Sequence, residues 1–325
     1  MSILSITAIL LCALAALLPV NCHQNATLRE RDHLDHHTRQ AKWDGIYQGD
    51  LRLGSNVVYN NRTRRLNADI KHWDNFVSNG YFRVFVVIDD GYSAAETSII
   101  EQALKLLQYT GKTIKFQVKT SIPVGKDYIR IKKDGGCWSY LGRHESASDL
   151  EGQTVSIDSM CLNTRAIHHL MLHALGFGHE QSRTDRDKYV TINYDNIPEE
   201  HHKDFAKMDG IPTYGIPYDF KSVMHYEEYA FAANWNKKTI VSKTNQQIDT
   251  SLNRCSWFDF MKLRLRYQCI DPQTQASIPR TFQDYKAVKC KHICQCWKRS
   301  AHCNNDNENC KGNLVCKKNV CVSPY

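Results

Sequence analysis

Three histidines stand close together in the segment Ile167-His-His-Leu-Met-Leu-His-Ala-Leu-Gly-Phe-Gly-His-Glu180. His169 and His173 are four residues apart, so on a helix they project from one face, about 40° apart. Gly176 can end that helix in a left-handed turn, after which His179 returns toward the same point. Three imidazoles that leave one tetrahedral position open form the ligand set of catalytic zinc. The pattern predicts one zinc ion per chain; three solvated or core histidines are the disfavoured alternative.

The segment resembles the metzincin signature H-E-x-x-H-x-x-G-x-x-H. Other segments narrow the resemblance to the astacin family of zinc metalloendopeptidases. These are Gly136–Gly142 (GCWSYLG), Arg183–Tyr194 (RTDRDKYVTINY), Ser222–Tyr226 (SVMHY), and Tyr47–Asp50 (YQGD). The resemblance runs from about residue 47 to about residue 269. A Cys-rich C-terminal tail makes the chain similar to the nematode-type secreted members of the family.

The resemblance implies how the metal is held. His169, His173 and His179 would bind zinc, and the hydroxyl of Tyr226 would be an additional ligand that swings away to stabilise the transition state. Asp50 would occupy the open metal position in a latent form, until a prosegment is removed. The implied reaction is hydrolysis of peptide bonds in extracellular proteins.

The resemblance also implies roles for residues around the metal. Met224 would pack beneath it. Glu180 would meet the new N-terminus near Leu66 after the prosegment is cleaved. Cys137 and Cys161 would form one of the two disulfides of the family.

The chain departs from the family at the general base. Leu170 stands where a glutamate takes the proton of the attacking water and passes it to the leaving amine. General acid–base help of this kind contributes roughly 10²–10⁴-fold to the rate, and a leucine side chain cannot move a proton.

A different alignment could hide the base. If Leu172 were an insertion, His168 would be the first ligand and His169 would take the base position. His168 and His173 would then be five residues apart, off one helix face unless the helix contains a π-bulge. The ungapped alignment keeps His169 eight residues after Cys161, as in the family, and is favoured. Neither alignment supplies a glutamate. A sequence error at residues 168–172 is a third explanation for its absence.

Two further departures concern packing. Thr113 stands where the family has a cysteine, and that cysteine's partner corresponds to Cys269. Cys255 is extra, and we expect it to pair with Cys269 instead. Gly178 replaces a common aromatic residue before the last ligand, which we expect to widen the floor of the site.

Hydrophobic periodicity indicates the elements that must position the site. Strands are predicted at 81–88, 114–118 and 128–131, and helices at 93–107 and 166–176. This is a mixed α/β (α+β) unit with a twisted sheet and an active-site helix, of one domain's length, over residues 66–270.

The N-terminal segment predicts secretion. Residues 1–22 form an apolar run typical of a cleaved signal peptide. Residues 23–65 are polar, and we interpret them as a propeptide that ends in the basic run Arg62-Thr-Arg-Arg65. Asn25 and Asn61 lie in N-glycosylation sequons. The predicted location is extracellular.

The C-terminal segment predicts a linker at 271–289 and a disulfide-rich module at 290–325, where seven of the thirteen cysteines lie. This module is expected either to dock an extracellular partner or to serve only as a stapled cap. The net charge of +8 is accompanied by no nucleic-acid motif, and no later apolar run could span a membrane. The expected partners are therefore extracellular proteins or peptides, as substrates or as ligands.

Two functions remain open from the sequence. One is a slow endopeptidase that relies on zinc, Tyr226 and the cleft. The other is a pseudoprotease that keeps the fold and the metal and acts as a decoy, inhibitor or matrix protein. Leu170 favours greatly reduced or absent catalysis.

Overall fold

The computed structural model describes residues 46–52, 57–60, 65–68, 70–73, 77–78, 81–111, 113–123, 125–144, 152–267, 315–317 and 320–322. The predicted signal peptide, both sequons, residues 62–64 of the basic run, Cys269 and the linker lie outside the described residues. Of the Cys-rich module, only the backbone of two short strands is described, β14 (Val315–Lys317) and β15 (Val320–Val322), which pair antiparallel. No helix within the described ranges has the length and apolar character needed to cross a membrane.

The main sheet is mixed, and its strands follow the order β1-β2-β9-β10-β8-β6-β5, with β7 paired to β6 outside this order. The strands are β1 (Ile46–Tyr47), β2 (Leu51–Arg52), β5 (Val77–Ser78), β6 (Tyr81–Ile88), β7 (Ile114–Lys119), β8 (Tyr128–Lys132), β9 (Cys137–Tyr140) and β10 (Gln153–Ile157). The pairs β6–β7, β6–β8 and β8–β10 are parallel, whereas β9 runs antiparallel to β10. The run YFRVFVVI of β6 is rich in β-branched and aromatic residues, which favour a strand that packs on both faces.

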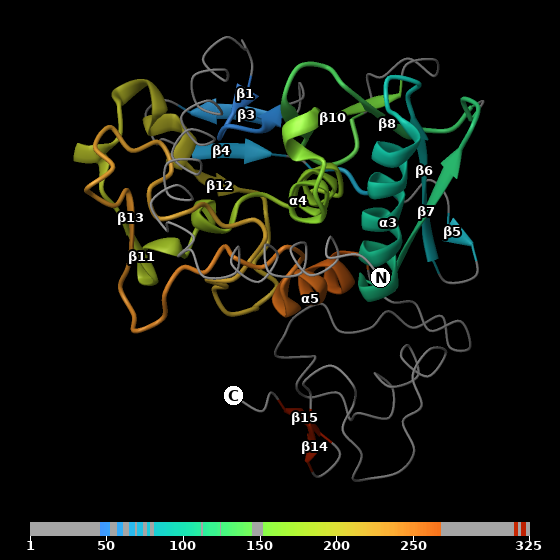
Figure 1. Ribbon diagram of the computed structural model, residues 1–325. Helices are drawn as coiled ribbons and strands as arrows, with labels where there is room; N and C mark the ends of the chain where they lie inside the picture. The colour runs from blue at the N-terminus through green and yellow to red at the C-terminus, as the bar shows by residue number, and fades with distance from the viewer. Residues whose placement is uncertain are drawn as a thin grey trace, which may run out of the picture. The chain divides into compact units, whose positions relative to one another are not determined.

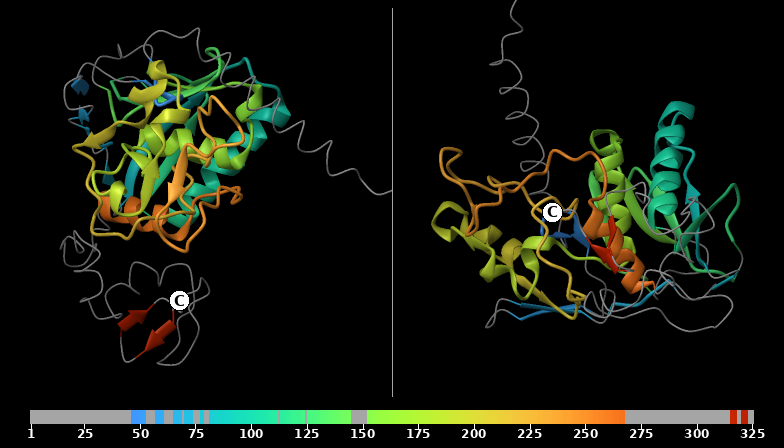
Figure 2. Two further views of the ribbon diagram at one scale, coloured as in Figure 1. Left: turned by 90° about the vertical axis from the view of Figure 1, so that its left-hand side faces the viewer. Right: turned by 90° about the horizontal axis from the view of Figure 1, so that it is seen from below.

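Two helices, α3 (Ala94–Gly111) and α4 (Thr164–Ala174), pack side by side against the sheet (Figures 1 and 2). The largest core cluster lies between them and the sheet, and Val84, Ile100, Ile129 and Met171 in it are completely buried. Burial of apolar area on this scale is the dominant favourable term for the fold.

The part of the chain after α4 is largely irregular. It contains the short 3-10 turns η2 (Glu180–Ser182), η3 (Arg186–Lys188), η4 (Tyr194–Asn196) and η5 (Glu199–Phe205), the strand pair β11 (Val190–Ile192) and β13 (Ile240–Ser242), and the helix α5 (Trp257–Arg266). A second core cluster supports this region around Phe205, Tyr218, Phe220 and Phe231. Helix α5 also contacts α3, which joins the irregular region to the sheet side of the molecule.

Part of the predicted propeptide is built into the fold. Strands β1 and β2 form a hairpin, and β2 adds to the edge of β9 in parallel, with Leu51 opposite Ser139. A three-stranded sheet pairs β3 (Val57–Asn60) with β4 (Arg65–Ala68), and β4 with β12 (Lys207–Asp209). The polar composition of this segment suggests a solvated surface. Leu51 is nevertheless completely buried, so part of the segment packs against the domain.

The predicted elements agree with the observed ones. The strands expected at 81–88, 114–118 and 128–131 are β6, β7 and β8, and the helices expected at 93–107 and 166–176 are α3 and α4. The mixed sheet with an active-site helix is confirmed as the fold class. The sequence did not indicate β9, β10 or α5.

Candidate metal centre

The three predicted ligands converge on one point. His169 and His173 come from α4, and His179 follows the turn that ends this helix. Nε2 of His169 lies 3.0 Å from Nε2 of His173 and 3.3 Å from Nε2 of His179. The ligand atoms of these histidines and of Asp50 all lie within 4.8 Å of one another, and they form the one His/Cys/Asp/Glu cluster of this kind in the described ranges. The three histidines that the ungapped alignment names are therefore the ones that the structure brings together.

Local signals at both ends of α4 aim the helix at this point. Asn163 caps its start, because its side chain accepts the N–H of Ala166. Gly176 has φ of 92°, and its N–H donates to the carbonyl of His173. This is the left-handed helix end that glycine favours, and it turns the chain back toward the metal position.

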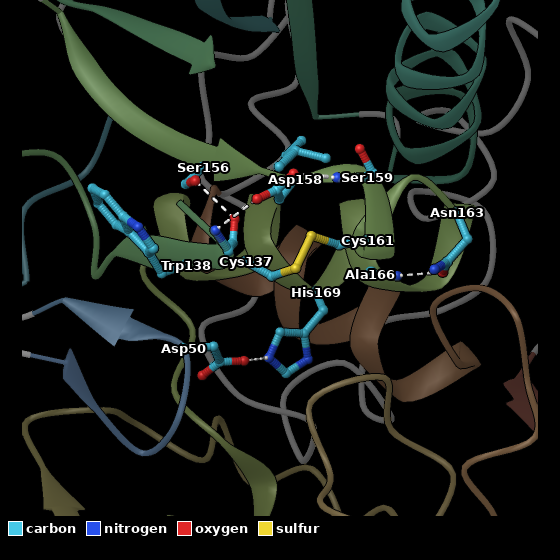
Figure 3. Close-up of a disulfide and its surroundings, with 12 residues drawn as sticks. Asp50, Cys137, Trp138, Ser156, Asp158, Ser159, Cys161, Asn163, Ala166 and His169 are labelled. Atoms are coloured by element: carbon cyan, nitrogen blue, oxygen red, sulfur yellow. Dashed lines mark hydrogen bonds and ion pairs between the residues drawn. A yellow bond between two sulfur atoms is a disulfide. The ribbon is translucent and has the colours of Figure 1, made fainter. Parts of the chain in front are cut away.

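A disulfide fixes the segment before the helix. Cys137 at the start of β9 is bonded to Cys161, the last residue of the 3-10 turn η1 (Ser159–Cys161). Figure 3 shows the disulfide close to α4, with Asp50 facing the His169 ring. The disulfide implied by the resemblance is thus present, and it holds β9 near the helix that carries the ligands.

The second ring nitrogen of each histidine has a partner. Nδ1 of His169 lies 2.8 Å from the Val223 carbonyl oxygen, and Nδ1 of His173 lies 2.7 Å from that of Phe177. A carbonyl only accepts, so each Nδ1 carries the proton and each Nε2 presents a lone pair. Outer partners of this kind fix the tautomer and orientation of metal-ligating histidines.

Asp50 completes the cluster from the opposite side. Its Oδ2 lies 2.5 Å from Nε2 of His169, and its Oδ1 lies 3.1 Å from Nε2 of His179 and 3.4 Å from Nε2 of His173. Oδ1 is buried and accepts no hydrogen bond. A buried carboxylate oxygen without a hydrogen bond, facing three imidazole nitrogens, fits a divalent cation bound among them.

The protonation states also suit a metal. Burial lowers the pKa of His173, and it lowers that of His179 to about 4, so both rings are neutral near pH 7. Burial alone would raise the pKa of Asp50, but His179, His169 and His173 together hold it well below its usual value. Neutral imidazoles and an ionised carboxylate are the forms that bind zinc. A zinc ion held here would supply a Lewis acid that polarises a peptide carbonyl.

Leu170 follows the first ligand, and its side chain belongs to the main core cluster, with 2% of its surface exposed. His168 does not replace the base. Its Nε2 lies 3.0 Å from the Ala103 carbonyl oxygen, on the α3 side of the helix, and its Nδ1 lies 3.4 Å from the backbone nitrogen of Cys255. The alternative alignment with His168 as a ligand is therefore wrong, because this ring lies between α3 and Cys255, away from the other ligands.

Tyr226 and Met224 flank the ligands. The Tyr226 ring lies 4.7 Å from the His179 ring, and its hydroxyl donates a short hydrogen bond to the Gln48 carbonyl. Burial and the charges of Asp50 and Asp204 raise the pKa of this phenol well above its usual value. Its role as an additional ligand stays a prediction. Met224 is buried, and its carbonyl accepts the N–H of Glu180, next to His179.

Glu180 already has partners in the uncleaved chain. Its Oε1 accepts from Nη1 of Arg183 at 2.9 Å and from the backbone N–H of Asp219 at 2.9 Å, and its Oε2 accepts from Nζ of Lys262. Burial alone would raise the pKa of Glu180, but the charges of Lys262 and Arg183 lower it. Contact with a new N-terminus near Leu66 stays a prediction, and such a contact would have to compete with these bonds.

Two packing expectations are wrong. Cys255 is a free, buried thiol rather than a partner of Cys269, and its Sγ lies 3.5 Å from Nδ1 of His168. Gly178 does not widen the floor of the site. A Cβ there would lie 2.4 Å from Cδ1 of Ile211 and 2.9 Å from Sδ of Met208, so these side chains fill the space.

The domain that carries this site matches a known peptidase family. The model of the peptidase family Astacin matches residues 67–268, more than half of the chain. The chain belongs to the astacin family. Members of this family are zinc-dependent, so the cluster of three histidines and Asp50 is the site able to hold the metal.

The astacin relatives confirm a metalloprotease domain. The chain is 32% identical over 237 residues to the zinc metalloproteinase nas-8 of Steinernema carpocapsae, an alignment that covers 70% of this chain and 53% of that protein. It is 38% identical over 189 residues to the zinc metalloproteinase nas-14 of Caenorhabditis elegans, covering 56% and 36%. The chain thus spans about half of the first relative and about a third of the second.

A solved structure supports the same fold. High choriolytic enzyme 1 of Oryzias latipes, a hatching enzyme zinc-protease, superposes with a TM-score of 0.53 at 32% identity. The match covers 61% of this chain and 93% of that one.

Sequence reasoning missed one residue of this astacin site. Gln48 is completely buried next to His179, and its Oε1 lies 2.8 Å from Nδ1 of that ring. The sequence contained a signal, since Gln48 lies in the segment that resembles the family's latency motif, but we assigned a role only to Asp50.

Proposed function

We propose that this chain is a secreted astacin-family zinc protein, made in a latent form, whose peptidase activity is strongly reduced or lost. The observation that carries the proposal is Leu170, which occupies the base position on a helix whose metal ligands are all retained. The expected loss is roughly 10²–10⁴-fold in rate, the usual contribution of a general base.

The surroundings of the ligands support this proposal. Within the described residues, His168 is turned toward Ala103 and Glu180 is bonded to Lys262 and Arg183, so neither side chain faces the metal position. Asp50 is next to the metal position, but it belongs to the predicted propeptide, whose strand β2 pairs with β9. The latent form is supported by this carboxylate and by the pairing of β2 with β9.

A second candidate is an inactive protein that binds peptides as a decoy, an inhibitor or a matrix component. Strand β9 favours it, because β2 of the predicted propeptide already pairs there as an extended segment. Addition of a strand to an exposed sheet edge is a common mode of peptide recognition. Extracellular proteins or peptides are the partners in both cases, and the Cys-rich module is proposed to dock one of them.

Replacement of Leu170 tests the proposal. The natural chain and the Leu170→Glu variant would be cleaved after Arg65 by a trypsin-like protease, loaded with zinc and compared on quenched peptide substrates. We expect equal zinc content and a kcat/KM at least about 100-fold higher for the variant. Leu170→Gln is the matched control, because it has the shape of glutamate without the base, and it should stay as inactive as the natural chain.

Equal hydrolysis by the natural chain and Leu170→Glu would contradict the proposal. A natural chain that binds zinc and peptides but gives no hydrolysis above the Leu170→Gln control would select the inactive binding protein over the slow enzyme.

A further inference from the structure

Gln48 is a polar residue in a completely buried place. Its side-chain amide has three partners: Oε1 lies 2.8 Å from Nδ1 of His179, and Nε2 donates to Oγ of Ser182 at 2.9 Å and to the Ala206 carbonyl oxygen at 3.2 Å. Nearly all the hydrogen-bonding capacity of a primary amide is used. The described part of the chain thus encloses this side chain in a pocket of polar groups.

The backbone of Gln48 is held as well. Its N–H donates to Oδ1 of Asp204 at 2.7 Å, and its carbonyl accepts from the Tyr226 hydroxyl. Its φ of 52° is uncommon for a residue other than glycine. Gln48 lies in the turn of the β1–β2 hairpin, where Gly49 also has a positive φ of 79°, so the hairpin and the pocket together set the position of Gln48.

Metal binding determines the orientation of the Gln48 side-chain amide. If Nε2 of His179 binds a cation, Nδ1 of the same ring must carry the proton and donate. The amide oxygen then faces His179, and the NH2 group faces Ser182 and the Ala206 carbonyl, which only accepts. One acceptor and one two-proton donor on a planar group describe a carboxamide.

The pocket also completes the outer shell of the metal. His169 and His173 donate to backbone carbonyls of the main domain, whereas the acceptor for His179 belongs to the predicted propeptide. When the propeptide leaves, this N–H loses its partner. A side chain that enters the pocket would restore it, so occupancy of the pocket and metal binding are coupled through His179.

We propose that the pocket formed by His179, Ser182, Asp204, Ala206 and Tyr226 is a glutamine-recognising subsite. It binds the Gln48 side chain of the chain's own propeptide in the latent form. After the propeptide leaves, it binds the glutamine side chain of a peptide ligand. The proposal deepens the proposed peptide-binding function and rests on it.

The chemistry of the pocket explains the preference. A methionine has the length of glutamine but leaves one donor and two acceptors buried without partners, which is costly. A glutamate can accept from His179 but places its second oxygen against the Ala206 carbonyl, where two acceptors meet. A site built to hydrogen-bond one group rejects analogues that lack it.

The first test uses the full-length chain, loaded with one zinc, and measures the rate of zinc release to a chelator. Gln48→Met should release zinc roughly 10- to 100-fold faster, the usual effect of losing an outer partner of a ligand. Arg52→Met is the control. Arg52 lies in the same segment, over the Trp138 ring and away from the pocket, so this variant should stay within about twofold.

A double-mutant cycle separates recognition from general loosening. Ser182→Ala should speed zinc release in the natural background and have much less effect in the Gln48→Met background, because the partner is already gone. Independent, multiplicative effects of the two substitutions would overturn the proposal.

The second test uses peptides on the chain cut after Arg65, with the propeptide still present. The probes are the peptide Ile-Tyr-Gln-Gly-Asp-Leu-Arg and its Gln→Met and Gln→Glu forms, competing with the propeptide. The glutamine peptide should compete at least about tenfold better than either analogue. Equal competition by all three, or none by any, would overturn the subsite.

These are binding measurements, so their result is separate from that of the hydrolysis test. The natural chain could hydrolyse peptides well, against the proposed function, and still prefer the glutamine peptide. Conversely, an inactive chain that binds the three peptides equally would overturn only the subsite.

Discussion

His169, His173 and His179 converge on one position without help from the side chain of residue 170. Each ring has an acceptor for Nδ1, and each Nε2 points at the same position. None of these contacts involves the side chain of residue 170, which packs in the core cluster. At the scale of the residue, metal binding and proton transfer are therefore separable, and a substitution at residue 170 can remove the second alone.

Lys262 and Glu180 give a stability prediction at the residue scale. Both side chains are buried, and they form an ion pair close to His179. Lys262→Met leaves a buried carboxylate with only part of its compensation, so we expect the free energy of unfolding to fall by about 3 kcal/mol. Urea unfolding measures this change.

The control is an exposed pair of the same type. Lys105 and Glu101 lie four residues apart on α3, with side chains 69% and 37% exposed. Lys105→Met should change the unfolding free energy by less than about 1 kcal/mol. If Lys262→Met were equally mild, the buried pair would not be needed to hold Glu180.

At the scale of elements, α5 supports the turn that carries Met224. Asp259 in the first turn of α5 accepts from the backbone N–H of Val223 and from Oγ of Ser222, and it also forms the capping box with Ser256. The carbonyl of the same Val223 accepts from His169. A single residue therefore links the start of α5 to a metal ligand, and the position of His169 depends on this helix.

Asp219 gives a pH prediction for the same junction. Burial, and then the charge of Asp259, raise its pKa to about 7. The folded state holds this proton more tightly than the unfolded state, so the stabilisation is complete below pH ~4 and is lost as the pH rises through about 7. The free energy of unfolding of Asp219→Asn, relative to that of the natural chain, should therefore rise by roughly 2–4 kcal/mol from pH 4.5 to pH 8.

Urea midpoints measured across this pH range provide the check. Asp90→Asn, at an exposed loop position after β6, is the control and should follow the natural chain. A difference between natural chain and Asp219→Asn that is constant with pH would show that the carboxyl of Asp219 does not titrate in this window.

The elements that the sequence predicts are those with strong local patterns. The run from Tyr81 to Ile88 and the histidine helix carry their own periodicity, and Gly176 marks the helix end, so their positions follow from the chain alone. The strand β9 is short and contains a disulfide cysteine, and its pairing with β10 and β2 depends on distant segments. The Gln48 pocket draws on residues more than 130 positions away, which no local pattern reveals.

At the scale of the molecule, the predicted propeptide and the metalloprotease domain form one fold within the described residues. The β2–β9 and β3–β4 pairings join them by backbone hydrogen bonds, Asp50 enters the metal cluster, and Leu51 is buried. Four protein ligands around a metal form a closed site, which is typical of structural rather than catalytic zinc. The intact chain is therefore expected to hold zinc more tightly than the chain without residues 23–65.

The most direct test of this account is X-ray absorption at the zinc edge on the intact, zinc-loaded chain, beside Asp50→Ala. We predict one four-coordinate zinc with three imidazole nitrogens and one carboxylate oxygen at about 2.0–2.2 Å. In Asp50→Ala, the three imidazoles should remain and the carboxylate should be lost. A shell with fewer than three imidazoles, or with sulfur at about 2.3 Å, would contradict the assignment of His169, His173, His179 and Asp50 as the metal centre.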